Sequence, residues 1–230
     1  MTAEEFKNQF DVLYDIATLS APGVTEYEKS VFLSTAQLKI LDAHYLKMEN
    51  SPLMPDLISN LIRHVSLTNI KDTSLIKNIN KKSRYGIKSY LFKRPTNIYQ
   101  IAYEQLNTSA DIIEITKIGY SKVGKTLSNP FRADINSRAW RIIGQERSDS
   151  EYIEILYKGD IIDYIIRYVE NPKPIITETL TDGFTIDGET DISNGSLNEI
   201  SHDEILALAV ELATTAYQEN TLQNQVGINQ

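Results

Sequence analysis

The sequence predicts an α+β fold with N-terminal helices, a central, mostly antiparallel β region and a C-terminal amphipathic helix. Apolar residues recur at helical spacing in residues 1–66, alternate with polar residues in residues 87–187, and return to helical spacing from about Ser201. Helices and strands are thus grouped in blocks, unlike the alternation of repeated βαβ units. Residues 67–86 are rich in Asn, Lys and Ser, which predicts a connecting loop, and residues 188–230 hold a loop, the last helix and a tail. We expect these parts to form one composite domain.

Each main helix is predicted to open with Ser or Thr followed three residues later by Glu, which is the spacing of a capping box. The three pairs are Thr2 with Glu5, Thr25 with Glu28, and Ser201 with Glu204. Pro22-Gly23 separates the first two helices, and a shorter helix is predicted from about Pro55. The tail after Tyr217 is rich in Gln and Asn, so we expect it to be frayed in a free subunit.

The apolar residues of these helices predict which face of each helix is buried. The expected buried residues are Phe6, Phe10, Leu13 and Tyr14 in the first helix, Tyr27, Val31, Leu38, Leu41 and Tyr45 in the second, Leu57, Ile58, Leu61 and Ile62 in the short one, and Ile205, Leu206, Leu208, Ala209, Leu212 and Ala216 in the last.

The central block is rich in β-branched and aromatic residues at alternating positions, which predicts strands. Two turn sequences, Lys158-Gly159-Asp160 and Asp182-Gly183, predict hairpins. The expected strands cover residues 98–103, 112–118, 139–143, 152–157 and 161–166.

Positive and negative charge are separated along the chain. The net charge is −8, but residues 63–147 carry 16 Lys and Arg against 6 Asp and Glu, or +10, and the remainder carries 7 against 25, or −18. A chain this acidic is a poor sequence-independent DNA binder as a whole. Opposite charges on different faces of identical subunits favour head-to-tail contacts, which close into rings. The simpler interpretation is an uneven surface charge without such a role.

The composition excludes several kinds of site. The absence of cysteine excludes disulfides, thiol nucleophiles and thiolate metal sites. The three histidines are isolated and lack the spacing of a metal-binding pair. An acidic cluster lacks the ligand spacing of a calcium loop and is interpreted as a solvated turn; it comprises Asp182, Asp187, Glu189 and Asp191. We expect no metal and no cofactor.

No apolar run approaches the length needed to span a membrane, and the acidic, polar N-terminus is not typical of a signal peptide. We expect the protein to stay in the cytosol unless it leaves as part of a particle.

One motif matches the P-loop pattern G-x-x-x-x-G-K-[ST], with Gly119, Gly124, Lys125 and Thr126 at the defining positions. A P-loop must open into a helix whose N-terminus faces the phosphates, but Pro130 would fall in the second turn of that helix. We therefore interpret the motif as a loop between strands and keep nucleotide binding as the alternative.

No other catalytic arrangement is recognisable. Carboxylates are plentiful, but no frame positions them as a catalytic pair, and Trp140 and the thirteen tyrosines are interpreted as core and interface residues. We expect that the protein is not an enzyme.

Several stretches, in the right order over most of the chain, resemble a structural protein of crAss-like short-tailed phages of Bacteroides. They are EEFKNQFDVLYD and APGVTEYEKSVFLSTAQ near the N-terminus, Asn129-Pro-Phe-Arg132, Arg138-Ala-Trp-Arg141, Tyr164-Ile-Ile-Arg-Tyr168, Asn171-Pro-Lys-Pro-Ile-Ile176, and Ser201-His-Asp-Glu-Ile-Leu206 with Ala209-Val-Glu-Leu-Ala213.

The resemblance implies a ring protein of the tail barrel, similar to head–tail connectors (adaptors), stacked below the portal and forming part of the conduit for genome ejection. Such rings are expected to be dodecamers in the virion, assembled in the host cytoplasm, with the portal and other ring proteins as partners. The implied family supplies no catalytic residues. We expect the ring docked on the portal in particular, with DNA passing through it without specific binding. We also expect some of the acidic residues between Asp182 and Glu204 to face the lumen or an axial docking surface.

Two alternatives remain at this stage. One is a nucleotide-binding protein or ATPase that uses Gly119 to Thr126, and the other is a DNA-binding protein that uses the basic middle of the chain.

Overall fold

The computed structural model describes residues 1–18, 21–48, 58–70, 86–109, 111–128, 138–143 and 152–228. The chain divides into two compact units, Met1–Leu61 with Asn171–Gln230, and Ile62–Glu170. We call the first the helical unit and the second the barrel unit. The predicted α+β class is confirmed, with strands inserted between the N-terminal helices and the C-terminal one.

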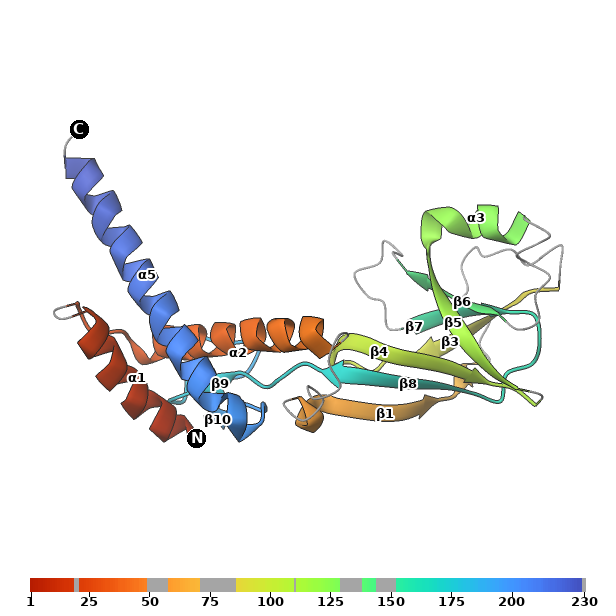
Figure 1. The fold of residues 1–230 in the computed structure, drawn as a ribbon, viewed down its shortest axis with the longest axis horizontal. Coiled ribbons are helices and arrows are strands. Elements are labelled where there is room, and N and C mark those ends of the chain that lie inside the picture. The colour runs from red at the N-terminus through yellow and green to blue at the C-terminus, as the bar shows by residue number, and fades with distance from the viewer. Residues whose placement is uncertain are drawn as a thin grey trace. The chain divides into compact units, whose positions relative to one another are not determined.

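The helical unit is built on three helices (Figure 1). Helix α5 packs against both α1 and α2, and the distal part of α5 extends beyond them. The elements are α1 (Ala3–Thr18), α2 (Glu26–Met48), the 3-10 turn η1 (Ser59–Leu61), β9 (Ile175–Ile176), β10 (Ser193–Asn194), the 3-10 turn η3 (Glu199–Ser201) and α5 (His202–Ile228).

The capping prediction is confirmed at α1 and α2 and wrong at α5. The Thr2 N–H donates to Glu5 Oε2 at 2.7 Å, and the Thr25 N–H donates to Glu28 Oε2 at 2.8 Å. At α5 the buried Ser201 hydroxyl has no partner in the described part of the chain, because the preceding turn η3 is capped by Asn198 instead.

The ends of the helices differ from prediction in two further places. Helix α5 continues to Ile228, so the segment after Tyr217, expected to be frayed, is helical. The short helix expected from about Pro55 lies outside the described residues as far as Leu57, and its remainder is wrong, since Ser59–Leu61 forms a 3-10 turn and Ile62 begins a strand.

The buried face of α1 largely agrees with prediction, whereas that of α2 does not. Phe6, Phe10 and Tyr14 are buried, but Leu13 is 39% exposed. On α2 the expected apolar stripe is mostly half-buried, and the buried face combines apolar residues with polar ones; it consists of Lys29, Ser30, Leu33, Ser34, Ala36, Gln37, Ile40, Leu41 and His44. On α5 the predicted Ile205, Leu206 and Ala209 are buried.

The polar residues on α2 form a seam of hydrogen bonds with the extended segment 173–177. Ser34 Oγ donates to Ile175 O at 3.1 Å and accepts from Ile175 N at 3.0 Å. Ser30 Oγ accepts from Thr177 N at 3.0 Å, and Gln37 Nε2 donates to Lys173 O at 2.7 Å. Side chains of a helix thus provide the partners that a neighbouring strand would otherwise give this backbone. A prediction from apolar periodicity cannot detect such a seam.

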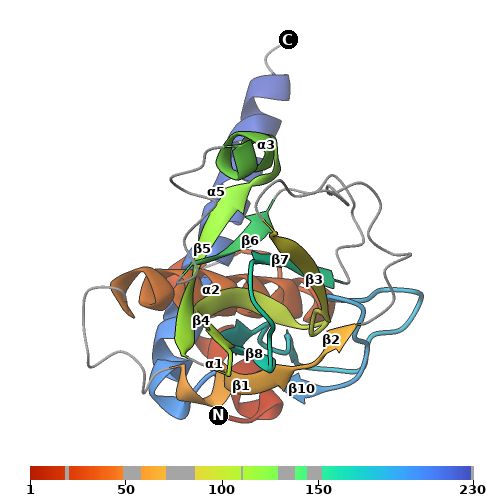
Figure 2. The ribbon, with the colours of Figure 1, turned by 90° about the vertical axis from the view of Figure 1, so that its right-hand side faces the viewer.

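The barrel unit is one curled sheet with the order β1-β8-β4-β5-β6-β7-β3-β2 (Figure 2). All neighbouring strands are antiparallel except β5 and β6. The elements are β1 (Ile62–Leu67), β2 (Asn69–Ile70), β3 (Lys88–Lys93), β4 (Ile98–Asn107), β5 (Ile112–Gly119), α3 (Tyr120–Ser128), β6 (Ala139–Ile143), β7 (Tyr152–Tyr157) and β8 (Asp163–Glu170).

The two edge strands of this sheet are joined by a single residue. Thr68 alone separates β1 from β2, yet β1 pairs with β8 and β2 pairs with β3 at the opposite edge. The sheet must therefore curl until its edges meet, as in a small barrel. Its inner face is filled by large apolar side chains, among them Phe92, Leu106, Ile155, Tyr164 and Ile166.

The hairpin predicted at Lys158-Gly159-Asp160 is wrong. Strand β7 pairs with β3 and β6, whereas β8 pairs with β1 and β4. The turn is held against β3 instead, because Tyr90 Oη donates to Gly159 O at 2.6 Å and Lys88 Nζ lies 2.6 Å from Asp160 Oδ1. Of the loop expected over 67–86, residues 71–85 lie outside the described residues, and residues 67 and 69–70 belong to strands.

Removing one hydroxyl from the seam should destabilise the helical unit. We expect Ser34→Ala to lower the free energy of unfolding by about 1–3 kcal/mol, because it leaves the buried N–H and C=O of Ile175 without partners. Thr35 is exposed on the same helix, so Thr35→Ala is the matched control and should change stability by less than about 0.5 kcal/mol. Urea unfolding of the full chain measures both values; equal midpoints for the two variants would contradict the role of the seam.

A glycine beside the seam gives a second stability prediction. Gly195 has φ +76°, and a Cβ there would lie 2.5 Å from Gln37 Oε1 and 2.7 Å from Ile175 Cγ1. Gly183 has a similar φ of +81° but open space around it. We expect Gly183→Ala to cost about 1–2 kcal/mol for the backbone conformation alone. Gly195→Ala should cost about 1–3 kcal/mol more because of the clash, as measured by the same denaturation.

Candidate interaction surfaces

The charge separation seen in the sequence follows the two units. The helical unit has 5 Lys and Arg against 19 Asp and Glu, a net charge of −14, and the barrel unit has 18 against 12, or +6. Each copy of the chain therefore presents one strongly acidic unit and one basic unit.

The barrel unit contains a cavity of about 280 Å³ that we call the cationic pocket. Three cationic side chains line it, namely Arg94, Lys117 and Arg141, against one carboxylate, Glu154. Tyr99, Gln100 and Tyr152 add neutral polar groups to the lining. The pocket thus carries a net positive charge and offers several hydrogen-bond donors.

The sheet topology explains where the pocket lies. Strands β4 and β5 pair only over Gln105–Asn107 and Ile112–Glu114. Beyond these residues β5 pairs with β6, while β4 remains paired with β8 alone. Apart from Arg94, which follows β3, the lining residues come from the first part of β4 and from β5, β6 and β7, which flank this separation. Lys117 and Arg141 are register partners on the parallel strands β5 and β6, which places the two cations side by side.

One wall of the pocket is anchored in the core. Arg141 Nε lies 3.0 Å from Glu104 Oε1, and Tyr164 Oη donates to the same oxygen at 2.7 Å. Glu104 and Tyr164 are both buried, and burial, together with the neighbouring Glu104 carboxylate, raises the pKa of Tyr164, which keeps its hydroxyl protonated as a donor. The contact ties β4, β6 and β8 together and fixes the position of Arg141.

The carboxylate in the lining is already engaged. The Ser89 hydroxyl donates to Glu154 Oε1. The pocket suits an anionic group, a carboxylate or a phosphate, because its cations outnumber its carboxylates.

Within the described ranges no cluster of three His, Asp or Glu residues could hold a metal ion.

The predicted acidic turn is an ordered loop, which we call the acidic loop (residues 180–191). The Asp182-Gly183 turn is present, with φ of +60° and +81° and Phe184 N donating to Thr181 O at 3.1 Å. It is not flanked by paired strands as the hairpin prediction required. A second Asp-Gly turn, at Asp187-Gly188, is closed by two hydrogen bonds between Ile186 and Glu189 of 3.0 and 2.9 Å.

The carboxylates of the acidic loop point to solvent. All four side chains singled out in the sequence, Asp182, Asp187, Glu189 and Asp191, are exposed. The base of the loop is closed by Leu180 N, which donates to Thr190 O at 2.9 Å. The loop contacts α2 through the Phe184 ring, whose centroid lies 4.7 Å from that of Tyr27.

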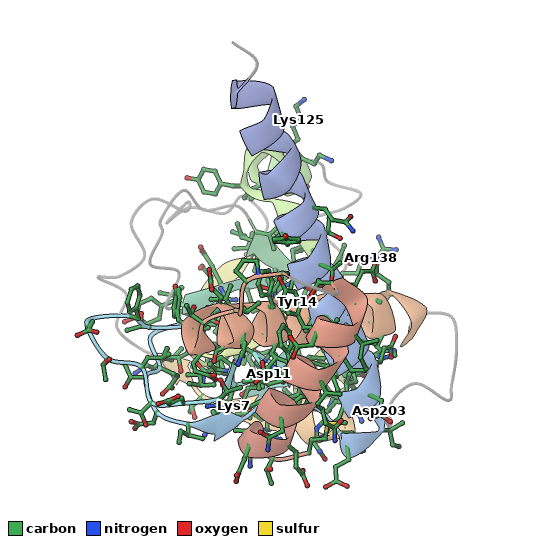
Figure 3. The ribbon with its side chains drawn as sticks, turned by 90° about the vertical axis from the view of Figure 1, so that its left-hand side faces the viewer. Lys7, Asp11, Tyr14, Lys125, Arg138 and Asp203 are labelled. Carbon is green, nitrogen blue, oxygen red and sulfur yellow. The ribbon has the colours of Figure 1, made fainter. Side chains whose placement is uncertain are left out.

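Two lysines of the helical unit, Lys7 and Lys29, form ion pairs with carboxylates outside the acidic loop. Lys29 lies 2.7 Å from Asp11 and 2.8 Å from Glu26, and Lys7 lies 3.3 Å from Glu26. Burial opposes the charge of Lys29, but hydrogen bonds to Asp11 and Glu26 raise its pKa. Figure 3 shows Lys7 and Asp11 on successive turns of α1.

The exposed side of α1 carries apolar residues in its second half. Val12 is 58% exposed and Ile16 is 67% exposed, on the side of the helix away from buried Phe10 and Tyr14. Exposed apolar side chains gathered in this way are typical of a contact surface.

The P-loop-like segment is helical, so the predicted loop between strands is wrong. Gly119 ends β5 and Tyr120–Ser128 forms α3, so the backbone amides from Gly124 onward are used within the helix. Thr126 is buried, whereas Lys125 is exposed and projects from α3 (Figure 3), so the two side chains do not share a site. Neither Gly119 nor Gly124 has a positive φ or a neighbour within 4 Å of a Cβ. The sequence β5, α3, β6 does give one parallel strand pair, but the motif lies in its helix and not in a phosphate-binding loop.

The sequence did not single out the pocket residues. The count of charges located a basic region, but Lys117 and Arg141 come from two strands and Arg94 follows a third, and only the strand pairing brings them together. None of the helices described is both long enough and apolar enough to cross a membrane.

The whole chain is similar to known proteins. A family model described as phage tail ring protein 3/4 matches residues 1–225. The protein named Ring protein 4/5 of Bacteroides phage crAss001 is 33% identical over 238 residues, covering 100% of this chain and 99% of that one. Ring protein 3 of the same phage is 29% identical over 231 residues, covering 93% and 95%.

The helical conformation of the motif can be tested at Gly124. We expect Gly124→Ala to raise the free energy of unfolding by about 0.5–1 kcal/mol, because alanine favours the helix and has space there. Urea unfolding measures the change.

Nucleotide binding can be tested at Lys125. We expect ATP with Mg²⁺ to leave the melting temperature of the wild type and of Lys125→Ala unchanged. A rise with ATP in the wild type that Lys125→Ala removes would instead indicate a nucleotide site.

Proposed function

The chain belongs to the phage tail ring protein 3/4 family, and from this premise we propose that its copies form a closed ring in the tail barrel, below the portal. The ring is a structural part of the virion, assembled in the host cytoplasm, and forms a section of the conduit through which the genome is ejected. The observation that carries this proposal is the match of the family over residues 1–225, which is nearly the whole chain.

The charge of the two units supports a ring. Contact between the acidic unit of one copy and the basic unit of the next is heterologous, so every copy makes the same pair of contacts. Such a series closes when the rotation per copy divides a full turn, and we propose twelve copies. The exposed Val12 and Ile16 of α1 provide a further surface for contact with neighbouring chains.

The neighbours above and below are proposed to be related rings. Ring protein 3 and Ring protein 4/5 of one phage are both similar to this chain. We therefore propose a stack in which this ring contacts rings of the same fold. The portal lies at the end of this stack, and it is not the sole partner of this ring.

No enzymatic activity is part of the proposal. The family is structural, and the residues of the P-loop-like motif are distributed along α3 without forming a phosphate cradle. DNA passes through the ring without specific binding, which suits a chain whose net charge is −8.

The proposal is tested by imaging the purified protein, alone and mixed with the portal and neighbouring ring proteins, and by mass analysis of purified virions. We expect closed rings of about twelve copies, and the chain should be present in the virion in the same copy number. A protein that is absent from virions and remains monomeric with every tail protein would contradict it.

A further inference from the structure

We propose that the cationic pocket of one copy binds the acidic loop of the adjacent copy and so forms the lateral contact of the ring. This inference rests on the proposed ring. It assigns the acidic loop to the contact between neighbours, in place of the luminal or axial position expected from the sequence.

The pocket has the chemistry of a carboxylate receptor. Lys117 is exposed at the pocket and forms no ion pair within the described ranges, and Arg141 is held beside it by the buried Glu104. A cation fixed by a buried partner does not have to be ordered when a ligand binds, which lowers the entropic cost of association. The cavity of about 280 Å³ accommodates acidic side chains but not a folded element.

The acidic loop has the complementary properties. Asp187, Glu189 and Asp191 are exposed, and none of them forms an ion pair in the part of the chain that the structure describes. Two closed turns and the Phe184–Tyr27 ring contact hold the loop in one shape before any partner binds. The loop is therefore a preorganised acidic projection, and the helical unit, with 5 cationic residues for 19 carboxylates, is poorly supplied with cations to neutralise it.

A neighbouring copy is the occupant that fits both surfaces. Every subunit of a ring contacts one neighbour through one surface and the other neighbour through a second surface. These two surfaces must be complementary to each other. The pocket and the loop lie on the units with charges of +6 and −14, so their attraction also orients the subunits as they meet.

Charge reversal tests the contact directly. We expect Lys117→Glu, the pocket variant, to weaken self-association about 10-fold or more, because it sets a carboxylate against the acidic loop. Glu189→Lys, the loop variant, should have the same effect for the converse reason. A mixture of the two variants should recover ring formation, because in an alternating ring every reversed pocket meets a reversed loop. Mass photometry across a concentration series measures all three.

Matched controls lie outside the proposed contact. Lys122→Glu on α3 and Asp42→Lys on α2 make the same charge changes at exposed positions, and each should assemble within about 3-fold of the wild type. If wild-type rings form and the pocket and loop variants assemble as well as these controls, the lateral contact is wrong while the ring proposal stands. If the wild type forms no ring with any tail protein and is absent from virions, both proposals fail.

A covalent test separates a contact between copies from one within a chain. The protein has no cysteine, so the doubly substituted Lys117→Cys, Glu189→Cys chain has only the two test thiols. Under mild oxidation in assembled rings we expect a ladder of covalently linked copies, and each single variant should give none. A crosslinked monomer would overturn the contact between copies. A different result would also overturn it: pocket variants that lose binding to duplex DNA while loop variants assemble normally. The pocket would then bind phosphate.

Discussion

The single residue between β1 and β2 constrains the whole barrel unit. Because Thr68 alone separates strands at opposite edges of the sheet, the sheet cannot lie open. Curling it brings Tyr164 of β8, Glu104 of β4 and Arg141 of β6 into one buried cluster, and strand β5 leaves β4 to pair with β6. The cationic pocket lies at this change of partner. A surface proposed to bind a neighbour is thus a consequence of how the sheet closes.

The helical unit depends on hydrogen bonds between helix α2 and an extended segment. Its extended segment 173–177 has little strand pairing of its own, and Ser30, Ser34 and Gln37 of α2 satisfy its backbone. A buried polar seam is favourable only when its groups are paired, so it specifies how this segment lies on the helix. The same seam holds Gly195 so close to Gln37 that a larger residue does not fit.

The division of charge between the units connects the fold to assembly. A ring subunit needs attraction between different faces of identical chains, and units of −14 and +6 provide it without any catalytic chemistry. The P-loop-like motif also has a structural explanation that needs no nucleotide. Its lysines, Lys122 and Lys125, are exposed on a short helix whose other face, with Val123 and Thr126, is buried.

The sequence by itself determined the α+β class, two of the three capping boxes and the positions of strands such as Ala139–Ile143 and Tyr152–Tyr157, because these depend on residues close together in the chain. It also revealed the basic middle region and the ring-protein resemblance. The tertiary structure decided which strands pair, so β7 and β8 are consecutive but not partners. It also decided that the P-loop-like segment is a helix, that polar residues of α2 are buried, and that Arg94, Lys117 and Arg141 share a pocket. These features arise from contacts between distant segments, and apolar periodicity carries no information about the partner that a strand or a polar side chain will meet.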